Sequence, residues 1–180
     1  MLKLVVPAAE YWDEGREVFI NYPETVLRLE HSLVSVSKWE SRWNKVFLSR
    51  GEKTFEQTID YIRCMTITQN VPENVYDRLS AKNIEEVNAY IEAPMTATHI
   101  CEQGSGSYNS EQVTSELIYY WLISLGIPFE CQKWHLNRLL TLIRVCSVKS
   151  RPHKKMSKGE ISRRNAALNA ARRKKYNTKG

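Results

Sequence analysis

The stretch that decides the fold is residues 27–43, LRLEHSLVSVSKWESRW. Its first part alternates apolar and polar side chains, and this period of two predicts a β-strand over 26–30. From Ser32 onward the apolar residues recur every three or four positions, which predicts a helix with one apolar face. These apolar residues are Leu33, Val36, Trp39, Trp43 and Phe47. Ser32 is a suitable N-cap because its hydroxyl can accept a hydrogen bond from the first turn.

The residues before this stretch are typical of β structure. Residues 2–6 alternate apolar and polar side chains in part, and Pro7 ends that run. Asp13-Glu14-Gly15 then separates Tyr11-Trp12 from residues 18–20, which indicates a hairpin turn between two strands. We therefore expect a small N-terminal antiparallel sheet that includes the strand at 26–30.

The residues after this stretch are typical of helices. Thr54-x-x-Gln57 and Asn83-x-x-Glu86 have the spacing of a capping box, and each precedes a run with helical periodicity. Two strongly apolar helices are predicted over 111–125 and 132–146. Because a short link joins them, we expect an antiparallel pair at the centre of the core. Residues 102–109, EQGSGSYN, are predicted to be a loop.

The charge of the chain is distributed unevenly. The 180 residues have a formal net charge of +6, but residues 149–180 hold 12 Lys or Arg and one acid, which is a net charge of +11. The other 148 residues hold 14 basic and 19 acidic side chains, a net charge of −5. We therefore predict a globular domain over 1–148, followed by a basic linker and C-terminal helical arm over 149–180.

The arm itself is predicted to be helical over 162–176. Ser157-x-x-Glu160 is a further capping box, and the segment after it is rich in Ala, Arg and Lys. The predicted fold class is thus α+β and mainly helical, with the N-terminal sheet packed on four to five helices and the basic arm added to them.

Composition limits the classes of function. No run approaches the roughly 18 consecutive apolar residues of a membrane span, so we expect no membrane partner. The first residues lack the pattern of a signal peptide, and we expect a cytosolic protein with reduced cysteines.

The basic arm is the main candidate for partner binding. Basic residues spread around a helix suit an acidic protein surface, and they also suit nucleic acid bound without base-specific contacts. We favour a protein partner because Tyr176 is the only aromatic residue of the arm, which weakens a model of stacking on single strands. The residues predicted to bind are Arg163, Arg164, Asn165, Leu168, Asn169, Arg172 and Arg173. Leu168 would be the apolar anchor, and the arginines would pair with carboxylates of the partner.

Trp39 and Trp43 form a second candidate binding surface. They lie one helical turn apart and make an aromatic ridge, with Lys38, Arg42 and Lys45 nearby. Packing of this ridge in the core is the alternative that we favour, since most of the five tryptophans of the chain must be buried.

Motifs for catalysis and for metal binding are weak. His99, Cys101, Cys131 and His135 are side chains that zinc accepts, but their spacing matches no standard zinc site. The chain contains no glycine-rich phosphate loop, no His-Glu-x-x-His and no nucleophile elbow. We therefore predict no catalytic residue, no metal and no cofactor, and we predict that the chain is not an enzyme.

Five blocks of the sequence together carry a resemblance to a known family. They are LRLEHSLVSVSKWESRW (27–43), DYIRCMTITQNV (60–71), YIEAPMTATH (90–99), ELIYYWLISLGIPFECQKWHLNRLLTLIRVC (116–146) and RRNAALNAARRKKYNTKG (163–180). The chain resembles tail-module proteins of tailed bacteriophages with long non-contractile tails and of related prophages. The family that fits best is similar to the tail assembly chaperones.

The resemblance implies a phage morphogenesis protein of the host cytoplasm. Such a chaperone binds the tape measure protein and helps to recruit other tail proteins during tail assembly. Many tail chaperones are acidic at the C-terminus, whereas this chain is basic there, which favours an alternative. In that alternative the chain is a structural component of the virion, in the tail or the head–tail connector, and the arm docks on a neighbouring subunit. A nucleic-acid-binding protein is the second alternative, and the oligomeric state stays open.

Overall fold

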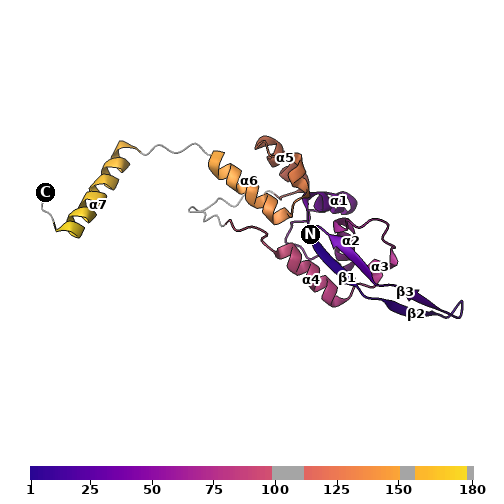
Figure 1. The fold of residues 1–180 in the computed structure, drawn as a ribbon. Coiled ribbons are helices and arrows are strands. Elements are labelled where there is room, and N and C mark those ends of the chain that lie inside the picture. Colours follow the sequence, from indigo (N-terminus) through magenta and orange to yellow (C-terminus); the bar gives the residue numbers. More distant parts are fainter. Residues whose placement is uncertain (99–111, 151–156, 178–180) are drawn as a thin grey trace. The chain divides into compact units, whose positions relative to one another are not determined.

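The computed structural model of the chain describes residues 1–98, 112–150 and 157–177 (Figure 1). The chain divides into two compact units, Met1–Ser147 and Val148–Gly180. The strands are β1 (Leu2–Val6), β2 (Ala9–Asp13), β3 (Val18–Tyr22) and β4 (Thr25–Leu29). The helices are α1 (Leu33–Trp43), α2 (Phe55–Met65), α3 (Asn74–Asp77), α4 (Ala81–Glu92), α5 (Ser115–Ser124), the 3-10 helix η1 (Phe129–Lys133), α6 (Leu136–Ser150) and α7 (Lys158–Tyr176). The predicted fold class, α+β and mainly helical, is confirmed. No helix of these described residues is long and apolar enough to cross a membrane.

The four strands form two separate two-stranded antiparallel sheets where we predicted one sheet. β1 pairs with β4 from Leu2↔Leu29 to Val6↔Thr25, and β2 pairs with β3 from Ala9↔Tyr22 to Asp13↔Val18. In both sheets the residue numbers of each pair of partners add up to 31, so β1–β4 and β2–β3 are paired in the same register. The ladder is interrupted beside Pro7 and Pro23, because proline has no amide hydrogen to donate. The prolines thus separate a ribbon that projects as β2–β3 (Figure 1) from its buried base, β1–β4.

The base of the ribbon, β1–β4, forms one hydrophobic core with the helices of the first unit. Leu4, Val6, Leu27 and Leu29 are fully buried on the inner face of β1 and β4. Helix α1 packs against α2, α5 and η1, and α4 lies against β1. The helices predicted over 111–125 and 132–146 contribute the fully buried Ile118, Leu122, Leu136 and Leu139 to the same core. The second of the predicted helices is divided, because η1 precedes an α6 that begins only at Leu136.

The helix starts follow the capping signals with one exception. Ser32, Thr54 and Ser157 cap α1, α2 and α7, and each belongs to a reciprocal capping box. The predicted cap of α4, Asn83, is instead the third helical residue in a box that begins at Ser80. The Asn83 side chain also donates to the backbone oxygen of Val5 at 3.1 Å. Its amide is therefore used to attach α4 to β1.

A buried carboxylate, that of Glu40, connects α1 to the loop that follows it and to the start of α5. Glu40 Oε1 accepts a hydrogen bond from the backbone amide of Phe47 at 2.8 Å, and Oε2 accepts one from the amide of Ser115, also at 2.8 Å. Ser115 is the first residue of α5, where amides have no partner within the helix and the helix dipole favours a negative charge. Glu40 therefore attaches the beginning of α5 to α1.

Candidate functional site

All seven residues predicted to bind a partner through the arm lie on α7. They are Arg163, Arg164, Asn165, Leu168, Asn169, Arg172 and Arg173, and all are exposed. No residue of this 19-residue helix is buried. Its first turn is closed by reciprocal hydrogen bonds between Ser157 and Glu160, at 2.8 and 3.2 Å. These hydrogen bonds also lower the pKa of the Glu160 carboxyl, because they favour its charged form.

The large apolar residues of α7 lie on one side of the helix. An α-helix turns by about 100° per residue, so Ile161, Leu168 and Tyr176 fall within a sector of about 80°. All three are exposed, and Leu168 is 47% accessible. Arg172 falls in the same sector. We call these four residues the α7 stripe.

The two tryptophans predicted as a binding ridge lie between α1 and α2. Trp39 is only 1% exposed, and its indole nitrogen donates to the backbone oxygen of Gln57 at 2.9 Å. Trp43 is half-buried and its indole nitrogen donates to Asp60 Oδ2 at 2.9 Å. The centres of the Trp39 and Trp43 rings are 6.3 Å apart. Trp39 therefore has no surface to offer a partner, and its aromatic area packs inside the domain.

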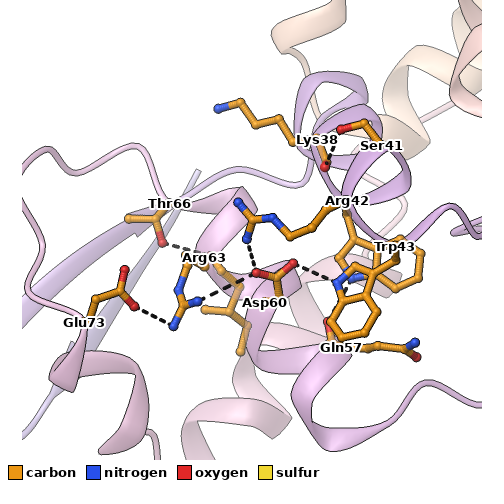
Figure 2. A network of polar contacts seen from close by, with 11 residues as sticks. Lys38, Ser41, Arg42, Trp43, Gln57, Asp60, Arg63, Thr66 and Glu73 are labelled. Carbon is orange, nitrogen blue, oxygen red and sulfur yellow. Dashed lines mark hydrogen bonds and ion pairs between the residues drawn. The ribbon is translucent and has the colours of Figure 1, made fainter.

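Asp60 is the centre of a polar network between α1 and α2 (Figure 2). Its Oδ1 accepts from Arg42 Nη1 and lies 3.8 Å from Arg63 Nη1, and its Oδ2 accepts from Trp43. The Asp60 side chain is only 7% exposed. Arg63 also pairs with Glu73, where the distance from Nη2 to Oε2 is 2.7 Å. Two guanidinium groups are thereby held beside one buried carboxylate.

A hollow of about 520 Å³ lies over this network, and we call it the α1–α2 hollow. Its lining residues are Lys38, Ser41 and Arg42 from α1 and Arg63 and Cys64 from α2. Three of the five are cations and none is an acid. Burial raises the pKa of the Cys64 thiol, and the Asp60 carboxylate raises it further, so the thiol is a poor nucleophile at neutral pH.

Sequence reasoning did not find this hollow. Lys38, Ser41 and Arg42 have the spacing i, i+3 and i+4, which is a signal that they share one side of a helix. Arg63 lies more than twenty residues further along, on another helix, and no local pattern connects it to them. The hollow exists because α1 and α2 pack against each other.

The residues considered for zinc do not form a visible site. His99 and Cys101 lie outside the described residues. Cys131 and His135 are buried, and the His135 Nε2 is 3.0 Å from the backbone oxygen of Tyr90. Within the ranges that the structure describes, no three His, Cys, Asp or Glu side chains are grouped so that they could hold a metal ion.

Comparison with known proteins gives similarity to one kind of enzyme. The chain is 27% identical over 95 residues to 5′-nucleotidase SurE of Campylobacter jejuni subspecies jejuni, and equally to that of subspecies doylei. Each match covers 49% of this chain and 37% of the relative, so the chain spans little more than a third of the length of these relatives. No protein-family model and no solved structure matches the chain. The prediction that the chain is not an enzyme is contradicted by its similarity to a 5′-nucleotidase.

Proposed function

We propose that this protein acts in phage tail assembly as a chaperone that binds the tape measure protein through α7, in the host cytoplasm. The observation that carries the proposal is the α7 stripe, which places three exposed apolar side chains and Arg172 on one side of a helix that buries none of its own residues. Helix α7 is about 28 Å long at 1.5 Å per residue. A partner helix could therefore lie along α7 and contact it over several helical turns.

The side chains of α7 suit a helical partner that carries acids beside an apolar face. Leu168 and Ile161 offer apolar area, and an arginine guanidinium can bind a carboxylate with two parallel hydrogen bonds. Packing of an apolar face provides most of the stability of helices in proteins. A partner that covers the stripe would therefore also stabilise α7.

The stripe can be tested by a matched pair of substitutions. We expect Leu168→Asp to weaken binding of the tape measure protein by about tenfold or more, because an interface anchor becomes a charge. Ala170→Asp adds the same charge on the opposite side of α7 and should leave binding nearly unchanged. The measurement is a co-expression pull-down of the tape measure protein encoded by the same phage, followed by titration of the purified proteins.

Equal losses in the two variants would contradict a role for the stripe, because both change the charge of α7 in the same way. The chaperone role has a separate test, which is mass spectrometry of purified virions. A chaperone is absent from the finished particle or present in trace amounts. A stoichiometric amount would instead support the structural tail or connector component.

The similarity to 5′-nucleotidase SurE favours a second candidate function, which we propose as hydrolysis of a nucleoside 5′-monophosphate. We expect the purified full chain to release inorganic phosphate from AMP at a rate above that of the heat-denatured protein. The assay is colorimetric phosphate detection with and without added divalent cations. No release under any of these conditions would contradict this candidate and would leave the proposal for α7 unaffected.

A further inference from the structure

Three cations line the α1–α2 hollow, and in the described part of the domain two carboxylates, Asp60 and Glu73, pair with the two arginines among them. Lys38, Arg42 and Arg63 line it, and the acid directly beneath them is Asp60. Both carboxylate oxygens of Asp60 already interact, one with the two arginines and the other with the Trp43 indole. Glu73 pairs with the far end of Arg63, and it is not part of the lining.

The two arginines are held in place before any ligand arrives. Asp60 binds Arg42, while Asp60 and Glu73 bind Arg63 on different nitrogens, and Figure 2 shows both guanidinium groups beside the Asp60 carboxylate. The Arg63 guanidinium also lies 5.0 Å from the centre of the Tyr76 ring. A side chain that is already ordered loses less conformational entropy when it binds, so this arrangement favours ligand binding.

Lys38 and Arg42 retain donors for a ligand, and Arg63 has one donor without a partner. Arg42 uses Nη1 on Asp60, its side chain is 55% exposed, and it lines the hollow. The Nε of Arg63 is buried and has no hydrogen-bond partner, which is unusual for a buried donor. Lys38 is exposed and forms no ion pair with any residue in the described part of the domain.

From this arrangement we propose that the α1–α2 hollow binds the phosphate group of a phosphate monoester. A phosphate dianion presents oxygens in several directions and can accept from three cations at once, whereas a carboxylate presents two oxygens in one plane. The hollow is large enough for a phosphate and leaves room for the group esterified to it. Inorganic phosphate and the phosphate of a nucleotide share this chemistry. The proposal stands on the geometry of α1 and α2 and does not depend on the role of α7.

The test uses the full chain and two phosphate probes, with binding followed by amide chemical shifts in NMR at low salt. We expect inorganic phosphate and AMP to shift the amides around Lys38 and Arg63, with a Kd on the order of 1 mM, whereas adenosine leaves them unchanged. Tighter binding of AMP than of phosphate would identify a nucleotide as the source of the phosphate. Equal affinities would identify the phosphate group as sufficient.

Lys38→Gln is the decisive variant because Lys38 has no ion pair to lose among the described residues. We expect it to weaken phosphate binding about fivefold. Lys82→Gln, on α4, removes the same charge from an exposed site outside the hollow and should bind like the unchanged protein. Equal weakening in the two variants, or no shift with either probe, would overturn the proposal. Phosphate release is measured in the same samples, so that a protein that binds phosphate without hydrolysing AMP is distinguished from one that does not bind phosphate in the hollow.

Discussion

Replacing Trp39 by alanine is expected to lower the free energy of unfolding by about 3–5 kcal/mol, the range for removing a large aromatic side chain from a core. Trp39 is 1% exposed and packs on Trp43 and on Phe47, with ring centres 6.3 and 5.2 Å away. The substitution also leaves the backbone oxygen of Gln57 without the indole donor. A cavity and a lost hydrogen bond therefore occur at the contact between α1 and α2.

Trp12→Ala is the matched control for this prediction. Trp12 lies on the projecting ribbon, is 49% exposed, and contacts Phe19 across the strands at 4.7 Å between ring centres. A cross-strand pair of this kind contributes about 0.2–1 kcal/mol. Both variants are measured by urea unfolding followed by far-ultraviolet circular dichroism. Equal destabilisation by the two substitutions would contradict the placement of Trp39 in the core.

The protein is expected to lose about 2–3 kcal/mol of stability between about pH 6.5 and pH 4.5 through His31 alone. His31 is 2% exposed, and burial together with the neighbouring His135 lowers the pKa of its imidazole to about 3. The folded state therefore keeps His31 neutral, whereas the unfolded chain binds a proton near pH 6.5. Because the unfolded state binds more protons below that pH, stability falls as the pH falls and is fully present above about pH 7.

The groups around His31 determine the control. Its Nδ1 forms a short hydrogen bond with the Tyr61 hydroxyl of α2, and its ring lies 5.1 Å from that of His135, whose pKa is also lowered by burial. His31→Gln keeps a polar group that can bond to Tyr61 and removes one titrating site. The free energy of unfolding of this variant should depend less steeply on pH over the same interval. Identical slopes for the two proteins would contradict the prediction.

Much of the secondary structure could be predicted from short segments of sequence. The strand at 26–30, the start of α1 at Ser32 and the start of α7 after Ser157 all depend on residues within one turn or one strand of each other. The start of α4 shows the limit of this reasoning. Ser80-x-x-Asn83 and Asn83-x-x-Glu86 both have suitable spacing, and the contact of Asn83 with Val5 is compatible only with the first.

The two candidate sites also differ in whether the local sequence could predict them. The α7 stripe could be predicted, because Ile161, Leu168 and Arg172 are brought together by the turn of a single helix. The α1–α2 hollow could not, because Arg63 meets Lys38 and Arg42 only when two helices pack. Whether the two tryptophans of α1 face a partner or the core was likewise decided by that packing.

The sequence by itself determined where α1, α2 and α7 begin, and it determined that the positive charge is concentrated in the last residues. These properties follow from side-chain periodicity, capping and composition, which act over a few residues. Only the tertiary structure decided that Glu40 holds the start of α5, 75 residues further along, and that His31 lies against His135. It also decided that three cations surround one hollow. The reason is physical, since such contacts depend on which faces of distant elements bury each other, and no local pattern specifies that choice.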